Sequence, residues 1–297
     1  MRKILIIGAS GFIGKKVADY LSHSGDFDVI RYSRFQQEGY FSCLIGDSDW
    51  VNMIDSCEAI INCSGVGLAK LKKNQRANED IAKQIVRSIP DSSDRKYKIL
   101  HLSSVKAYNA NNYKDIYSID KCRSEAVFFR GKHKLFGELL RIPAVFGQDD
   151  KNLQPLVRLA RKGQLPGINS HISDWHCITN NDVAYYIYCW LNKDNLSTLN
   201  ISYLLSEKRY SINDLVESIN HSVHGNGYQA RKKSLMYIKL IYSLLAVKSY
   251  ISSGFKSSNF PYARYQDLFE RDWKIDDSDG IDIHTIDVNL ADIWNSL

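Results

Sequence analysis

The sequence predicts an α/β fold, a doubly wound parallel sheet with a small C-terminal lobe. Short runs rich in Ile, Leu and Val alternate with longer amphipathic stretches over the first two hundred residues. These runs are almost continuously apolar, as expected for parallel strands that helices cover on both faces. A glycine-rich loop directly follows the first run, at the place where a strand would turn into a helix.

The apolar runs place the predicted strands in order. They are KILIIG (3–8), DVIRYS (28–33), AIINCS (59–64), KILHLSS (98–104), ELLRIPAVFG (138–147) and TLNISY (198–203). Helical periodicity predicts helices over 15–25 and 78–89, and a third over 211–225 that a serine caps. The alternation stops after about residue 207, so we expect the sheet to end there.

Composition narrows the class of protein. Of 297 residues, 44% are hydrophobic and 24% charged, which is ordinary for a soluble globular enzyme. The first apolar run, Ile4–Ile7, is too short for a signal segment, and Lys239 interrupts the longest later one, 234–247, which we interpret as a packed helix. A cytoplasmic protein is therefore expected.

Charge and cysteine spacing argue against two other classes. The net charge of +6 is spread along the chain, which favours a small anionic ligand over nucleic acid. The six cysteines show no CxxC or Cys/His ligand spacing. We therefore expect buried free thiols and no metal site.

The glycine loop GASGFIG (8–14) predicts a dinucleotide site because it lies between a strand and a helix. Gly8 permits the tight turn, Gly11 lets the backbone approach a pyrophosphate, and Gly14 allows close packing of helix and strand. N–H groups at the helix start, around Ser10, Phe12 and Ile13, would face the phosphates. We expect residues 1–165 to form this Rossmann-type domain, with 176–206 returning to it and 166–297 forming a smaller substrate-binding lobe.

The spacing G-x-x-G-x-x-G resembles that of the extended short-chain dehydrogenase/reductase family, which includes the NAD-dependent epimerase/dehydratases of nucleotide sugars. In that family an acidic residue ending the second strand holds the adenosine ribose. Here Ser33 takes that position and Arg34 follows, with Arg31 two residues before. A hydroxyl and a guanidinium suit a 2′-phosphate, so we expect NADP(H) rather than NAD. The alternative reading of Arg34 is an ordinary exposed residue at a strand end.

Three further segments resemble the family in order. GD (46–47) resembles the family segment whose aspartate contacts the adenine amino group, which implies that role for Asp47. IINCSG (60–65) resembles the family's fourth-strand segment, whose following small residues line the cofactor. Those lining residues are Cys63, Ser64 and Gly65. LRIPAVFGQ (140–148) resembles the next strand and its glycine turn, which adds Pro143 to the cofactor-binding set.

The stretch YSIDK (117–121) matches the family's catalytic Tyr-x-x-x-Lys. Upstream, HLSSVKAY (101–108) resembles its serine segment, which implies that Ser104 is catalytic with Tyr117 and Lys121. The helical spacing puts Tyr117 and Lys121 on one face, one turn apart. A second such pair, Tyr228–Lys232, has none of this context, and we interpret it as coincidence.

Carbonyl reduction explains the grouping. A tyrosine hydroxyl, with a pKa of about 10, releases its proton poorly at neutral pH. A nearby ammonium and the positive nicotinamide ring favour the phenolate. Lys121 would also hydrogen-bond the nicotinamide ribose, and Ser104 would orient the carbonyl.

Departures from the family narrow the reaction. No carboxylate follows Ser104, which argues against a dehydratase, and NANNYKDI (109–116) is short and lacks proline. Asp182 and its neighbours match a downstream motif in which Trp175 replaces an arginine that contacts the substrate's diphosphate. Other cations are candidates to bind that diphosphate instead: Arg158, Arg161, Lys162 and the cluster ARKK (230–233). The alternative is that these residues are solvated charges on helices.

We expect NADPH-dependent reduction of the 4-keto group of a dTDP- or UDP-linked 4-keto-6-deoxysugar, a step of bacterial O-antigen or other surface-polysaccharide synthesis. The alternatives are a nucleotide-sugar 4-epimerase and a non-catalytic NADP(H) sensor. An intact Ser104, Tyr117 and Lys121 argues against the sensor. Family members often pair, so the resemblance also implies a homodimer.

Overall fold

The computed structural model describes most of the first 236 residues and a short segment near residue 285. The described residues are 1–67, 76–91, 95–108, 110, 115–147, 150, 153–168, 174–194, 196–225, 227–234, 236 and 282–290. Most of the predicted short rim (109–116) and of the predicted helix at 234–247 lies outside them. In this part of the chain, no helix is long and apolar enough to cross a membrane.

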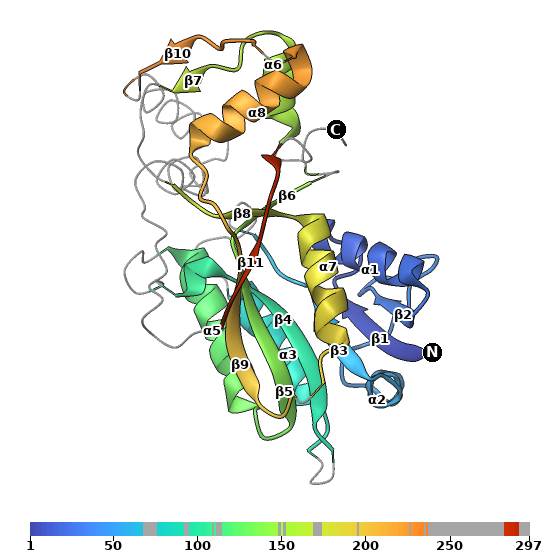
Figure 1. The fold of residues 1–297 in the computed structure, drawn as a ribbon. Coiled ribbons are helices and arrows are strands. Elements are labelled where there is room, and N and C mark those ends of the chain that lie inside the picture. Colours follow the sequence, from blue (N-terminus) through green and yellow to red (C-terminus); the bar gives the residue numbers. More distant parts are fainter. Residues whose placement is uncertain are drawn as a thin grey trace, which may run out of the picture. The chain divides into compact units, whose positions relative to one another are not determined.

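A seven-stranded sheet with the order β11-β9-β5-β4-β3-β1-β2 forms the centre of the fold (Figure 1). Its strands are β1 (Arg2–Ile7), β2 (Phe27–Tyr32), β3 (Ala59–Asn62), β4 (Tyr97–Ser104), β5 (Leu135–Ile142), β9 (Leu199–Ser206) and β11 (Asp282–Ile286). Neighbouring strands from β2 to β9 pair in parallel. The predicted doubly wound parallel sheet is therefore confirmed.

Helices cover both faces of this sheet. On one face α1 (Phe12–Ser24) packs against α7 (Asn180–Leu191) (Figure 1). On the other face lie α2 (Ser48–Ser56), α3 (Ala77–Ser88) and α5 (Ile116–Arg130), whose apolar side chains share one buried cluster with β1, β3, β4 and β5. The alternation of side chains along each strand supplies both faces with apolar residues.

The chain reverses direction across the sheet after β1, because β2 pairs on one side of it and β3 on the other. On the outer side of β2, Tyr32 and Phe41 form an isolated parallel β-bridge in place of a further paired strand. The carboxyl ends of β1 and β3 meet at this switch point, which is where open α/β sheets bind ligands. The topology therefore places the glycine loop at the expected binding edge.

The strand predicted over 138–147 is in fact two strands. Pro143 separates β5 from β6 (Ala144–Phe146), and β6 pairs with β8 (Cys177–Thr179) in a sheet of its own. Proline has no N–H to continue a ladder, which explains the break. The predictions also missed α2 and α7. The prediction of buried thiols is wrong in part, because only Cys57 and Cys177 of the six free cysteines are fully buried.

By its internal contacts the chain divides into two units. The first comprises 1–142, 180–204 and 280–284, and the second 143–179, 205–279 and 285–297. The second unit contains α6 (Gln154–Arg161), β7 (Gly167–Ile168), α8 (Ile212–His224) and β10 (Lys232–Lys233), around its own apolar cluster. A capping box at Ser211 and Asp214 begins α8, as the serine signal predicted. The predicted boundary at residue 165 stays a prediction.

The last strand, β11, lies at the sheet edge beside β9. Its His284 side chain is 3.7 Å from the buried Glu138 carboxylate of β5. Glu138 also accepts hydrogen bonds from Tyr186 of α7, at 2.7 Å, and from Ser202 of β9. A buried polar cluster thus connects β11 with two other strands and a helix.

Candidate functional site

The glycine loop is held against the end of β3 by contacts that exclude larger side chains. Gly8 has φ +82°, and a Cβ there would lie 2.7 Å from the backbone nitrogen of Ser64. A Cβ on Gly14 would lie 2.2 Å from the Gly8 carbonyl oxygen, which also accepts a hydrogen bond from Gly11 N. Only glycine avoids these clashes at Gly8 and Gly14. The loop and the 63–65 segment, both expected to line a cofactor, are adjacent.

The start of α1 has the character of an anion site. Gly11 is the N-cap residue of α1 and has no side chain, so no N-cap side chain accepts a hydrogen bond from the N–H groups of the first turn. A Cβ on Gly11 would meet only the Gly8 carbonyl oxygen within 4 Å. Ser10 and Gly11 are exposed, and Phe12 and Ile13 half-buried. These features fit a dinucleotide pyrophosphate, which would rest on the helix N-terminus.

The residues ending β2 differ in what they contact. Arg31 donates to the Asp19 carboxylate of α1 at 2.7 Å and is half-buried by that ion pair. Ser33 is buried, and its Oγ accepts from Phe35 N at 3.2 Å. Arg34 is exposed, with its guanidinium 5.9 Å from the Phe35 ring centroid. Of the two arginines, Arg34 is the one without a carboxylate partner among the described residues.

Asp47 begins α2. Its carboxylate accepts from Trp50 N at 2.8 Å and from Leu44 N at 3.1 Å, which caps the helix and closes the preceding turn. The carboxylate therefore already serves two backbone donors. A contact with an adenine amino group would be an additional hydrogen bond.

A buried hydrogen-bond chain that the sequence did not suggest holds the 63–65 segment. Asn62 Oδ1 accepts from Ser64 N at 3.0 Å, and its Nδ2 lies 2.9 Å from His101 Nδ1. His101 Nε2 is 3.1 Å from Ser124 Oγ of α5. Burial, with a smaller effect of the Lys121 charge, lowers the pKa of His101 well below its usual value, so the ring is neutral. The chain joins β3, β4 and α5 beneath the segment expected to line the cofactor.

Lys121 lies where these elements meet. Its Nζ donates to the Leu102 carbonyl of β4 at 3.1 Å, and a Cβ on Gly65 would be 3.3 Å from it. Burial lowers the pKa of Lys121 to about 8, although Glu125 and Asp120 oppose this effect. Burial also raises the pKa of the neighbouring Cys63 thiol to about 12, so that thiol stays neutral. Lys121 is thus a buried cation between the ends of β3 and β4.

Ser104 lies on β4, whose backbone Lys121 contacts, and Tyr117 lies on α5 together with Lys121. Ser104 ends β4, is 8% exposed, and accepts from Lys106 N at 3.3 Å in the 3₁₀ turn Val105–Ala107. Tyr117 is half-buried on α5, one turn before Lys121. The Lys106 ammonium lies 5.8 Å from the Tyr117 ring centroid. Tyr228 and Lys232, in contrast, lie in a loop and in β10, not on a helix.

Asp120 and Asn78 are further site residues, and sequence reasoning missed both. The buried Asp120 carboxylate accepts from Asn78 N at 2.9 Å, Asn78 Nδ2 at 2.7 Å and Glu79 N at 3.1 Å. Asn78 in turn receives Val66 N on its Oδ1 at 2.8 Å. Arg76, the N-cap of α3, provides no side-chain cap, so Asp120 serves the start of α3 from α5. The available signal was a carboxylate directly before Lys121.

A buried ion pair lies one turn beyond Lys121 on α5. Glu125, 3% exposed, accepts two hydrogen bonds from Arg141 of β5, at 2.9 and 2.7 Å. Ser103, beside Ser104, donates to the same carboxylate, and Arg141 donates to Tyr203 of β9. This network fixes α5, which carries Tyr117 and Lys121, against β5, β9 and the strand β4 that carries Ser104.

The remaining predicted residues belong to the second unit. Trp175 is 5% exposed and packs against Phe146 with ring centroids 5.8 Å apart, so it is part of that unit's core. Pro143, directly after β5, is half-buried. The cations considered for a diphosphate are all exposed on α6, at its C-terminus or in 230–233: Arg158, Arg161, Lys162 and the ARKK cluster.

Comparisons with known proteins agree with this fold. Residues 4–149, just under half of the chain, match the model of the NAD dependent epimerase/dehydratase family. A search of curated sequences finds no match.

Several solved structures have the same fold at low identity. UDP-N-acetylglucosamine 4-epimerase from Bacillus cereus is 17% identical, with a TM-score of 0.60 over 79% of this chain and 86% of that one. The human epimerase family protein SDR39U1, solved with NADPH, is 14% identical, with a TM-score of 0.61 over 80% and 85%. The terminal R domain of the myxalamid PKS-NRPS pathway is 13% identical, with a TM-score of 0.66 over 100% and 90%.

Proposed function

We propose that the whole chain is a member of the NAD dependent epimerase/dehydratase family and an NADPH-dependent oxidoreductase. Its substrate is a dTDP- or UDP-linked 4-keto-6-deoxysugar, whose 4-keto group it reduces to a hydroxyl. The observation that carries the proposal is the position of Lys121. Its buried ammonium lies on α5 one turn from Tyr117, against the end of β4 and beside Gly65 of the segment that adjoins the glycine loop.

Each residue has one task in this reaction. When bound, the dinucleotide supplies the hydride. Tyr117 gives its hydroxyl proton to the developing alkoxide, and the Lys121 ammonium stabilises the phenolate that remains. Ser104 donates a hydrogen bond to the same oxygen and orients the carbonyl. The carbonyl carbon would gain that hydride, its oxygen would gain the Tyr117 proton, and solvent would reprotonate Tyr117.

The preference for NADPH rests on Arg34. The sequence has no acidic residue at the end of β2, where a carboxylate would repel a 2′-phosphate. Because Arg31 is paired with Asp19, Arg34 supplies the guanidinium for that phosphate. A charge-assisted hydrogen bond of this kind contributes about 1.5–3 kcal/mol. Arg34→Ala should therefore raise KM for NADPH at least about tenfold and leave KM for NADH unchanged, whereas Arg123→Ala, another exposed arginine, should change neither.

The decisive experiment follows NADPH absorbance with dTDP- and UDP-linked 4-keto-6-deoxysugars, with NADH in parallel. We expect stoichiometric loss of NADPH in wild type. Tyr117→Phe should bind NADPH but lose about 10²–10⁴ of kcat. Tyr228→Phe is the matched control, because it removes the hydroxyl of the other Tyr-x-x-x-Lys pair, and it should keep wild-type turnover.

The second candidate is a nucleotide-sugar 4-epimerase, which the names of neighbours such as the Bacillus cereus enzyme favour. Interconversion of UDP-hexoses without net consumption of NADPH would replace the proposal by this alternative. A sensor would be identified if the protein bound NADPH, turned over none of these substrates, and kept its physiological effect in the Tyr117→Phe variant.

A further inference from the structure

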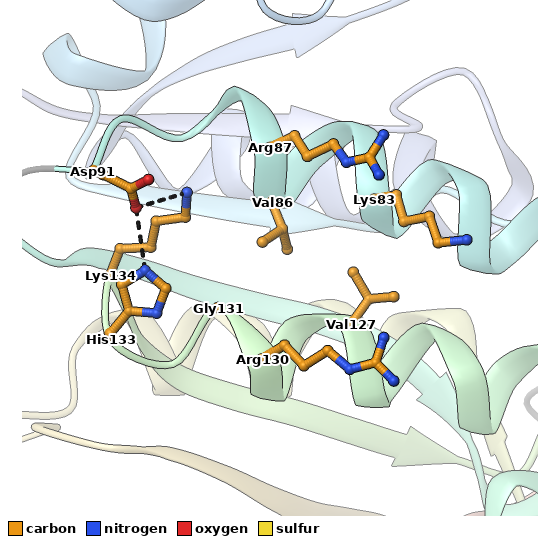
Figure 2. Close-up of a pocket in the computed structure, with 9 residues that line it drawn as sticks. All are labelled: Lys83, Val86, Arg87, Asp91, Val127, Arg130, Gly131, His133 and Lys134. Atoms are coloured by element: carbon orange, nitrogen blue, oxygen red, sulfur yellow. Dashed lines mark hydrogen bonds and ion pairs between the residues drawn. The ribbon is translucent and has the colours of Figure 1, made fainter.

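A cavity lies between the C-terminal halves of α3 and α5, within the first unit (Figure 2). It has a volume of about 270 Å³. Arg130 on its rim is nine residues beyond Lys121 on the same helix, which corresponds to about 13 Å along the axis. None of the residues assigned to the dinucleotide or to catalysis lines it. The cavity is therefore separate from the candidate site.

Its lining carries an excess of positive charge. Lys83, Arg87, Arg130 and Lys134 contribute four cations, against the one carboxylate of Asp91. Asp91 is paired with Lys134 Nζ and with His133 Nε2, each at 3.1 Å.

The two arginines are the uncompensated cations. Lys83 is neutralised by Glu79, 2.7 Å away and outside the cavity. Neither Arg87 nor Arg130 has a carboxylate partner in the part of the chain that the structure describes. Figure 2 shows these two side chains extending from facing helices.

The cavity is structured rather than a chance gap between mobile side chains. Lys134 is 6% exposed, and its Nζ donates to the Ile89 carbonyl at 2.8 Å, which fixes this charge at the Asp91 end of the cavity. Between the two arginines, Val86 and Val127 approach each other and form an apolar floor (Figure 2). A Cβ on Gly131 would lie 2.7 Å from Val86 Cγ1, so glycine permits this packing. A fixed cation, an apolar floor and two guanidinium groups that pair with no carboxylate of the described residues thus face one space.

We propose that this α3–α5 cavity binds a small molecule that carries phosphate groups. Guanidinium groups bind phosphate oxygens through two parallel N–H donors, which suits a ligand held between Arg87 and Arg130. Burial of Lys134 keeps its charge close to the ligand and less screened by salt than an exposed lysine. The inference concerns only this cavity and does not depend on the proposed reductase activity.

Inorganic pyrophosphate is the probe. Its binding to the full chain is measured by isothermal titration calorimetry at constant ionic strength set with chloride. The test variant is Arg87→Gln/Arg130→Gln, and the matched control is Arg123→Gln/Arg209→Gln, which removes the same charge from two exposed arginines outside the cavity. All four substituted side chains are exposed, so both variants should keep the wild-type thermal midpoint. Pyrophosphate that binds at the glycine loop is unaffected by either variant.

We expect wild type and control to show a binding event that weakens at least tenfold in the test variant. Identical isotherms for wild type and test variant would overturn the proposal. Equal weakening in the test variant and the control would also overturn it, because the binding would then follow net charge and not the cavity.

Discussion

Removing the Asp120 carboxylate should lower the free energy of unfolding of the first unit by the loss of several buried hydrogen bonds at once. The carboxylate is 1% exposed and accepts three hydrogen bonds from the start of α3. Asp120→Ala would leave these three buried donors unpaired at about 1–1.5 kcal/mol each, a loss of about 3–4.5 kcal/mol in the free energy of unfolding. Asp120→Asn keeps one acceptor oxygen for Asn78 and gives up the bond from Glu79 N, so its cost should be about 1–2 kcal/mol.

Urea unfolding measures these losses, provided that the m-value is unchanged. The control is Asp80→Ala on α3, because Asp80 is 63% exposed and its nearest cation, Lys83, is 3.9 Å away. That exposed pair should contribute less than about 0.5 kcal/mol. The reasoning is refuted if Asp120→Ala costs no more than Asp80→Ala, or if Asp120→Asn costs as much as Asp120→Ala.

Three further predictions concern single contacts. Gly14→Ala, whose Cβ would lie 2.2 Å from the Gly8 carbonyl oxygen, should lower the thermal midpoint and weaken NADPH binding together; an unchanged midpoint by calorimetry would contradict the packing argument. Glu125→Ala should lower the free energy of unfolding in urea by about 3–5 kcal/mol, because it leaves the buried Arg141 without its carboxylate. The double variant Glu125→Leu/Arg141→Met should recover most of that loss. If the double variant loses as much stability as Glu125→Ala, the charge explanation is wrong. Burial lowers the pKa of Lys121 to about 8, so turnover should fall as the pH rises through about 8 and the ammonium is lost. Stability should change in the opposite direction: in the unfolded chain the lysine pKa is 10.5, so between about pH 8 and 10.5 the unfolded state binds one more proton, and the free energy of unfolding should rise with pH. Lys121→Met should show no such rise in the free energy of unfolding.

The sequence was sufficient where the signal was local. A strand, a glycine loop and a helix start within fourteen residues predicted both the tight turn at Gly8 and the close packing at Gly14. The turn-spaced Tyr117 and Lys121 were likewise predicted to share a helix, and both lie on α5. In each case the geometry follows from neighbours in the chain, because helix period and glycine conformation act over a few residues.

The parts that were not predicted depend on distant partners. Arg31 was expected near a phosphate but is held by Asp19, because the end of β2 lies beside α1. Asp120 and Asn78 are 42 positions apart, and only the packing of α5 on α3 brings them together. Trp175 aligned with a binding arginine, yet its ring fills an apolar core. No local pattern distinguishes these outcomes, since each is decided by which elements become neighbours.

The order of synthesis gives β11 a particular importance. This strand covers the edge of β9, yet 80 residues separate Ile286 from Ser206, the last residue of β9. At about 5–20 residues per second, a ribosome needs roughly 4–16 s to make that stretch. During this interval the β9 edge of a growing chain offers unpaired backbone groups to any other nascent strand. Aggregation during expression should therefore depend on how quickly residues 207–286 are translated.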